Sequence, residues 1–193
     1  MLSLALYRKY IVASLWGAGM AIFLLNSALA QQESHEALMN RLFTELAEPD
    51  NPGWERAQNQ ILAEWEKSGS PAFDLLLKRG QQAMEAGDFD AAIEHLTALT
   101  DQAPDFAEGW NARATAFFLE GKFGPSMSDI EHVLALEPRH FGAISGLGLI
   151  LQELGRKEQA LKAFRASLAI HPHQDGINEA AEALEQELSG TEL

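Results

Sequence analysis

Apolar residues recur at helical spacing through the second half of the chain. In residues 141–174 they lie three or four apart on two successive stretches, which places each set on one face of a helix. Gly155 separates the two stretches and favours a turn, because glycine adopts positive φ without steric cost. Pro172 closes the unit, since proline cannot donate a backbone hydrogen bond into a continuing helix. The apolar positions are Ile144, Leu147 and Leu151, then Ala160, Leu161, Phe164 and Leu168.

The same two-helix unit recurs along the chain at a constant interval. Three glycines and three prolines keep this interval without insertion, and each glycine precedes its proline by the same distance in sequence. A period of about 34 residues with this punctuation predicts an array of helix–turn–helix repeats. The glycines are Gly87, Gly121 and Gly155, and the prolines are Pro104, Pro138 and Pro172.

The unit resembles the tetratricopeptide repeat, whose pattern sets large apolar residues, small residues and a closing proline at fixed positions. The third copy matches this pattern at Ile144, Leu147, Gly148, Leu151, Ala160, Phe164 and Pro172. The resemblance implies an all-α fold, a right-handed α-solenoid with repeats at 73–106, 107–140 and 141–174.

Small residues should mark the helix crossings within each repeat. They are Gly80, Ala114 and Gly148 on the first helices and Ala92, Ser126 and Ala160 on the second. Arg79 and Arg113 depart from the family, which has an apolar residue there. We expect their aliphatic stems to pack while their charged heads reach water.

Two segments flank the repeats. Residues 31–72 carry two amphipathic stretches around a proline-containing loop at 48–53, which predicts a helical hairpin or a degenerate repeat. Residues 175–193 should form a C-terminal capping helix and tail, as an open stack requires. The apolar face of this helix is Ile177, Ala180, Ala181, Leu184 and Leu188.

Residues 1–30 have the features of a signal peptide. Arg8 and Lys9 precede an apolar run, and Ala28 and Ala30 form the small-x-small pattern of a cleavage site. We expect cleavage after Ala30 and a periplasmic location. The alternative is an uncleaved inner-membrane anchor, because the apolar stretch is about long enough to span a bilayer. In both cases the repeats should face the periplasm, since basic residues before an apolar run stay inside.

Composition excludes several function classes. The chain has no cysteine, which excludes disulfides and thiolate catalysis. Arg8 and Lys9 are the only charged side chains within 1–30, so cleavage would take the formal net charge from −14 to −16. Such a charge excludes nucleic-acid binding, which needs clustered cations. It keeps the chain soluble and would also attract a basic partner, and both explanations remain open.

The sequence offers no convergent chemistry. His140, His171 and His173 fall near the ends of successive repeats, where they could lie along one edge as solvated loop side chains. Repeat ends should be about 10 Å apart, too far for these histidines to share a metal ion. No phosphate-binding loop, zinc-protease helix or nucleophile elbow is present. We therefore expect no catalytic residue, no metal, no cofactor and no enzymatic activity.

The resemblance implies a concave groove lined by the first helix of each repeat. Its exposed positions are Leu77, Gln81, Met84, Asn111, Thr115, Phe118, Ser145, Leu149 and Gln152, which we expect to contact a partner. The alternative for Phe118 and Leu149 is packing against the neighbouring helix. Some family members clamp a C-terminal carboxylate with cations in this groove. Here the corresponding positions hold Leu77, Gln81, Ala112 and Gly142, so that clamp is missing.

The predicted function is a non-enzymatic scaffold in the bacterial cell envelope that binds a protein or peptide. The alternatives are a self-associating structural array, which would be a homo-oligomer, and a membrane-anchored accessory subunit of an envelope assembly complex.

Overall fold

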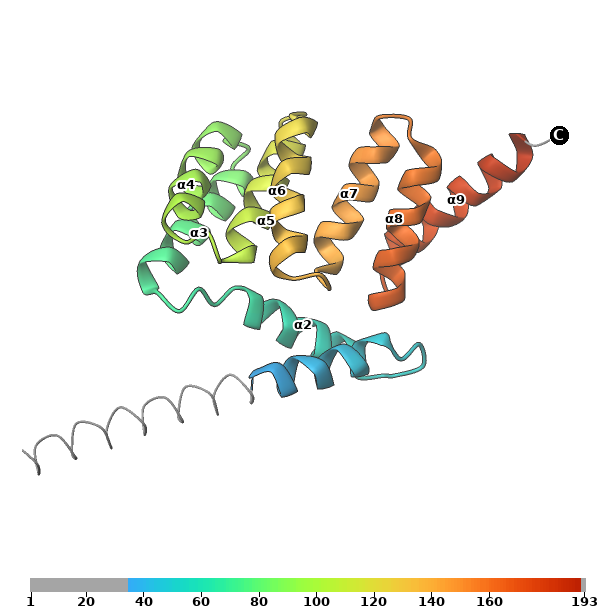
Figure 1. The fold of residues 1–193 in the computed structure, drawn as a ribbon, viewed down its shortest axis with the longest axis horizontal. Helices are drawn as coiled ribbons and strands as arrows, with labels where there is room; N and C mark the ends of the chain where they lie inside the picture. The colour runs from blue at the N-terminus through green and yellow to red at the C-terminus, as the bar shows by residue number, and fades with distance from the viewer. Residues whose placement is uncertain (1–34, 192–193) are drawn as a thin grey trace, which may run out of the picture. The chain divides into compact units, whose positions relative to one another are not determined.

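The computed structural model describes residues 35–191, all of them in helices and the loops between them (Figure 1). The signal peptide or anchor expected at residues 1–30 lies outside the described residues. The chain divides into two compact units, Met1–Leu42 and Phe43–Leu193. The boundary falls inside a helix at residues 35–47, and the repeats lie wholly in the second unit.

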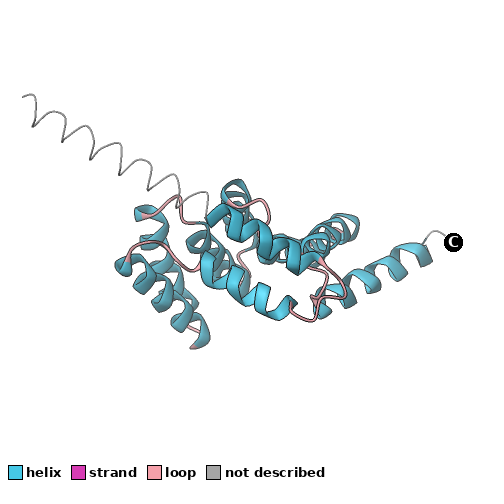
Figure 2. Cartoon of the chain, turned by 90° about the horizontal axis from the view of Figure 1, so that it is seen from below, coloured by secondary structure: helices cyan, strands magenta, loops and turns pink. Residues whose placement is uncertain are grey.

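Eight further helices follow in the described part of the second unit. They begin with α2 (Trp54–Trp65) and end with α9 (Asp175–Thr191). Between them lie three pairs: α3 (Pro71–Glu85) with α4 (Phe89–Gln102), α5 (Ala107–Leu119) with α6 (Phe123–Leu136), and α7 (Phe141–Glu153) with α8 (Lys157–Ile170). Figure 2 shows helices and loops with no strand among the residues that are coloured. The predicted all-α helical repeat solenoid is confirmed.

A glycine turn joins the two helices of each pair. Gly87, Gly121 and Gly155 have φ of +74°, +77° and +70°, as the repeat pattern predicted. At the last of these turns the Gly155 amide donates to the Gln152 carbonyl (2.9 Å) and the Arg156 amide donates to the Leu151 carbonyl (2.8 Å). This Schellman arrangement satisfies carbonyls that the end of α7 would leave without partners.

Close helix crossings explain the small residues. A Cβ added at Gly80 would lie 2.5 Å from a Leu96 side-chain carbon, and one at Gly148 would lie 2.4 Å from the Phe164 ring. Leu96 and Phe164 are fully buried, so each fills the space that the opposite glycine leaves. In the middle repeat the Ser126 hydroxyl donates to the Ala114 carbonyl across the same crossing (2.7 Å).

The helices of the repeats form two layers. Successive helices from α3 to α9 contact one another, and α5 also contacts both α3 and α7. The first helices therefore make one layer and the second helices α4, α6 and α8 make the other (Figure 1). This arrangement leaves α5 and α7 side by side, where their outward positions can form a common surface.

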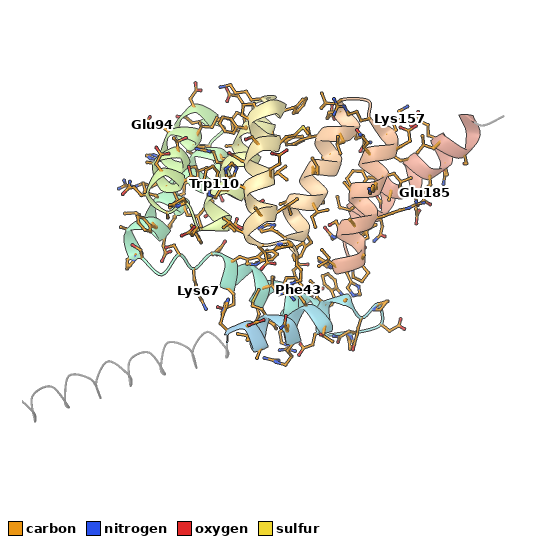
Figure 3. All side chains as sticks on the ribbon, in the orientation of Figure 1. Phe43, Lys67, Glu94, Trp110, Lys157 and Glu185 are labelled. Carbon is orange, nitrogen blue, oxygen red and sulfur yellow. The ribbon has the colours of Figure 1, made fainter. Side chains whose placement is uncertain are left out.

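The end helix α9 covers the last repeat. Ala181 and Leu184 are buried with Leu161 and Phe164 of α8, and Ile177, Ala180 and Leu188 pack against the same cluster. Arg165 pairs with Glu185 (2.7 Å), and Lys157 pairs with Glu187, so ion pairs border the contact on its exposed side (Figure 3). The capping role expected for this helix follows from this packing.

Candidate binding site

A pocket of about 270 Å³ opens between α5 and α7. The helical spacing of Asn111, Thr115 and Phe118 places them on one face of α5, and Ser145 and Leu149 face them from α7. Ile130 of α6 lies at its base. We call this site the inner pocket.

The inner pocket collects five of the nine residues expected in the groove: Asn111, Thr115, Phe118, Ser145 and Leu149. Gln81, Met84 and Gln152 lie outside it. Two of the nine expected exposures were wrong: Ser145 is only 8% exposed, although it lines the pocket, and Leu77 is only 3% exposed. It is buried with Ala112 and Ala116 of α5, whose small side chains leave the space that Leu77 fills.

Phe118 both packs within the chain and lines the inner pocket. Its ring lies 5.8 Å from that of Phe123, centroid to centroid, and packs against the buried cluster of the middle repeat. It nevertheless lines the inner pocket, so one side of the ring packs and the other faces the opening. Leu149 is 36% exposed, which leaves an apolar side chain available to a partner.

The polar groups of the inner pocket are neutral. The Thr115 hydroxyl donates to the Asn111 carbonyl (3.0 Å), and the Asn111 amide nitrogen donates to Glu108 (3.1 Å). The Asn111 side-chain oxygen is an acceptor that a ligand amide could use. None of the residues that line the pocket carries a charge. The pocket therefore suits an apolar side chain flanked by backbone groups, and it offers nothing to neutralise a carboxylate.

Comparison with known proteins identifies the repeats. Tetratricopeptide repeat family models match residues 77–124 and 143–174. A TPR repeat-containing protein of Rhizobium etli is 39% identical over 153 residues, which cover 79% of this chain and 75% of that protein. The chain belongs to the tetratricopeptide repeat family.

Solved tetratricopeptide domains share the fold. The first TPR domain of human RPAP3 has a TM-score of 0.57 at 26% identity, covering 61% of this chain and 93% of that one. The first TPR of Spaghetti (RPAP3), solved with a bound HSP90 peptide, has a TM-score of 0.57 at 26% identity, covering 60% of this chain and 91% of that one. The Sgt2 TPR domain from Aspergillus fumigatus has a TM-score of 0.60 at 22% identity, covering 64% of this chain and 83% of that one.

Arg113 departs from the tetratricopeptide pattern in a way that the sequence did not predict. Its side chain is only 13% exposed, and its guanidinium makes a two-pronged contact with Asp129, at 2.7 and 2.8 Å. Asp129 is 4% exposed, and the Thr100 hydroxyl accepts a further hydrogen bond from Arg113 (2.8 Å). The guanidinium also lies 4.8 Å from the centre of the Trp110 ring. Paired in this way, the charge can be buried. Arg79, at the same position of the first repeat, is exposed as expected.

The three histidines at the repeat ends lie along one edge, but two of them are not solvated. His140 and His171 are each 2% exposed. The His140 ring stacks on Trp65 at 4.1 Å, and its Nδ1 accepts from the Ala143 amide at the start of α7 (3.1 Å). Nε2 must then carry the proton and donate to Glu108 (3.2 Å). The expectation of solvated loop histidines was wrong because α2 packs against this edge.

His171 shows how burial controls its protonation. Its Nε2 lies 2.6 Å from Gln58 Oε1, and its Nδ1 is buried with no hydrogen-bond partner. A protonated ring would place a second N–H where nothing accepts it. Burial, with a smaller effect of nearby His173, lowers the pKa of His171 to about 4. His173 itself stacks on Trp54 at 4.7 Å. The contacts of His140, His171 and His173 with Trp65, Gln58 and Trp54 thus help to hold α2 against the repeats.

Residues 35–191 hold neither a cluster of candidate metal ligands nor a helix long and apolar enough to cross a membrane. No group of three or more histidine and carboxylate side chains in this range converges as metal ligands. Likewise, none of the helices described here has the length and apolarity of a membrane span.

Proposed function

We propose that this chain is a non-enzymatic scaffold that holds a peptide segment of a partner protein in the inner pocket. The observation that carries the proposal is the neutral, largely apolar cavity between α5 and α7, on the layer made by the first helices of the repeats. A related tetratricopeptide domain is solved with a bound peptide, which supports an interaction role for this fold. Solenoids also commonly bind partners in the groove that their repeats form.

The pocket favours an apolar anchor over a terminal carboxylate. Phe118 and Leu149 can contact an apolar side chain, and Asn111 can bond the backbone beside it. A peptide that relied on its carboxylate would lose its hydration without gaining a cation in exchange. The partner is therefore expected to present an internal segment with one large apolar residue, rather than a free C-terminus.

The cell envelope is the proposed location. Arg8, Lys9, the apolar run and the Ala28–Ala30 pair together support export through an N-terminal signal. N-terminal sequencing of the protein from its native host tests this, with Gln31 expected as the first residue. A full-length chain in the membrane fraction would favour the anchor instead.

Site-specific photocrosslinking tests the inner pocket. A benzophenone amino acid replaces Leu149, which lines the pocket, and in the control it replaces Leu136, a similarly exposed leucine (41%) outside it. We expect an adduct with another protein from position 149 and none from position 136. Adducts from position 136 alone would place the partner elsewhere. An adduct of twice the chain mass from position 149 would show that the pocket serves self-association.

Leu149→Arg supplies an independent measurement with the partner that crosslinking identifies. The variant should bind at least tenfold more weakly, because burying an unpaired guanidinium in an apolar pocket is costly. Leu136→Arg makes the same change at the control site and should bind as the native chain does. Equal binding by all three proteins would exclude the inner pocket.

A further inference from the structure

A second and larger groove lies on the opposite layer. It runs between α6 and α8, is floored by α7, and has a volume of about 580 Å³. Its walls are largely apolar and include Met127, Leu134, Ile144, Leu147, Leu151 and Ala163. We call it the outer groove. Ile130 lines both this groove and the inner pocket, so both openings lie at the junction of the second and third repeats.

The same place one repeat earlier is filled by the chain itself. Moving back by one repeat replaces Ile144, Leu147 and Leu151 by the larger Trp110, Arg113 and Phe117, and replaces the small Ala163 and Ala166 by Asp129 and His132. These larger side chains contact one another. His132 stacks on Trp110 with ring centres 4.3 Å apart, and Arg113 bonds Asp129 at 2.7 Å. Figure 3 labels Trp110 within this packed region.

The outer groove is therefore open because of side-chain size and not because the backbone register changes. Helices α6 and α8 keep the repeat interval of their counterparts α4 and α6. Aliphatic and alanine side chains stand where the earlier junction has three aromatic rings and an ion pair. The apolar surface left open is of the kind that a partner helix covers.

The charged side chains around the outer groove indicate which kind of partner helix would fit it. In the part of the chain that the structure describes, the lysines and arginines without an ion pair are Lys78, Arg79, Arg156 and Lys162. Two of them, Arg156 and Lys162, border the outer groove on the α8 side. Arg156 also stands at the start of α8, where the helix dipole adds positive potential. The α8 side of this apolar groove is therefore cationic, whereas the α6 side carries the acidic residue Glu131.

We propose that the outer groove receives an amphipathic helix of a partner protein, with its apolar face on α7 and acidic residues along the edge that faces α8. Met127 and Leu134 are seven residues apart on α6, so the groove follows about two helical turns, or about 10 Å. That length matches apolar anchors at positions i, i+3 or i+4, and i+7 of the bound helix. The proposal does not depend on the inner pocket, which lies on the other layer.

A second copy of this chain is a less suitable occupant. Its formal net charge of −14 opposes close association of two copies, although a local acidic helix could still be attracted. The experiment therefore includes the oligomeric state as an outcome.

The probe is a displayed library of helical peptides, each long enough for about five turns, with leucine at i, i+3, i+4 and i+7 and randomised flanking positions. Selection uses the whole chain from Gln31 onward. We expect the selected peptides to carry aspartate or glutamate on one flank. Replacing those acids by lysine should weaken binding at least tenfold, since attraction to Arg156 and Lys162 becomes repulsion.

Two sets of variants locate the binding. Ile144→Trp with Ala166→His reproduces, one repeat later, the stack that fills the earlier junction, and it should reduce binding of the selected peptides at least tenfold. Arg156→Glu with Lys162→Glu should weaken acidic peptides at least tenfold and favour lysine-flanked ones. The matched control is Lys78→Glu with Arg79→Glu, which changes the net charge equally at two unpaired cations away from the groove. It should leave binding within about twofold.

Three results would overturn the proposal. The first is a library that yields no binder, and the second is selected peptides that bind the charge-reversed chain as well as the native one. The third is a concentration-dependent dimer in sedimentation that Ile144→Trp with Ala166→His abolishes, since the groove would then belong to a second copy. If Ile144→Trp with Ala166→His folds poorly, Arg156→Glu with Lys162→Glu still tests the proposal. Both of these residues are exposed, so their substitution should not disturb the fold.

Discussion

Two glycines of one helix should respond to alanine in opposite directions. Gly148 and Gly146 both lie inside α7, where alanine is favoured over glycine by about 1 kcal/mol. A Cβ at Gly148 would stand 2.4 Å from the ring of Phe164, whereas one at Gly146 would meet only Ile130 at 3.9 Å. The intrinsic preference is therefore the same at both positions, and only the space around the new methyl group differs.

The magnitudes follow from this difference in space. Phe164 is fully buried, so its ring cannot move away without disturbing its neighbours, and overpacking of this kind costs about 1–3 kcal/mol. A contact of 2.4 Å places this cost in the upper part of that range, at about 2–3 kcal/mol. After the gain of about 1 kcal/mol in helix preference, Gly148→Ala should lower the free energy of unfolding by about 1–2 kcal/mol. Gly146→Ala should raise it by about 0.5–1 kcal/mol, since 3.9 Å is an ordinary van der Waals contact. For a domain of this size the melting temperatures should move by about 2–4 °C per kcal/mol.

Urea unfolding followed by circular dichroism measures both variants. The test becomes specific when Phe164→Leu is added, because the shorter side chain leaves room beside residue 148. We expect the double variant Gly148→Ala with Phe164→Leu to be more stable than additivity allows, by about 1 kcal/mol in a double-mutant cycle. Equal effects at residues 146 and 148, or no coupling to Phe164, would refute the close crossing between α7 and α8.

Three further predictions address other parts of the structure. Asp129→Ala should destabilise the chain by about 3 kcal/mol in urea unfolding, because it leaves the guanidinium of Arg113 buried without its carboxylate. Gly121→Val should cost about 1–2 kcal/mol in the same assay through backbone strain alone, since φ is +77° and no atom lies within 4 Å of an added Cβ. The pKa of about 4 for His171 means that the unfolded chain binds a proton near pH 5 that the folded chain does not. Between pH 7 and pH 5 the native chain should thus lose about 1–2 kcal/mol more stability than His171→Gln, in paired unfolding curves.

The repeat of about 34 residues predicted the structural features that occur once in every repeat. The turns at Gly87, Gly121 and Gly155 and the close approach at Gly148 all follow from it, because each depends on one residue at a fixed place in the repeating unit. The groove prediction was less complete. It assumed that equivalent positions are equally exposed, yet Leu77 and Ser145 are buried, whereas Asn111, the equivalent residue of the middle repeat, is only partly buried.

Long-range contacts that occur only once in the chain could not be predicted from the repeat pattern. The bond between His171 and Gln58 joins residues 113 apart, and the Trp65–His140 stack depends on α2 packing across the ends of the repeats. Burial of a histidine by a distant helix leaves no periodic signal in the sequence. Arg113 is different, because its partner was detectable: Asp129 is a second polar departure from the pattern in the same copy, where the third repeat has Ala163.

Paired departures from the repeat pattern also explain why the two junctions between repeats differ. A polar residue at one consensus position is costly to bury unless a second polar residue satisfies it. Arg113 and Asp129 satisfy each other in this way and fill the junction of the first and second repeats. The third repeat has neither residue and follows the consensus more closely, with Leu147 and Ala163 at the same places. Its junction is consequently less filled, and both the inner pocket and the outer groove lie there. The repeat that best matches the family pattern is thus the one that leaves apolar surface open, whereas the divergent residues Arg113 and Asp129 pack within the chain.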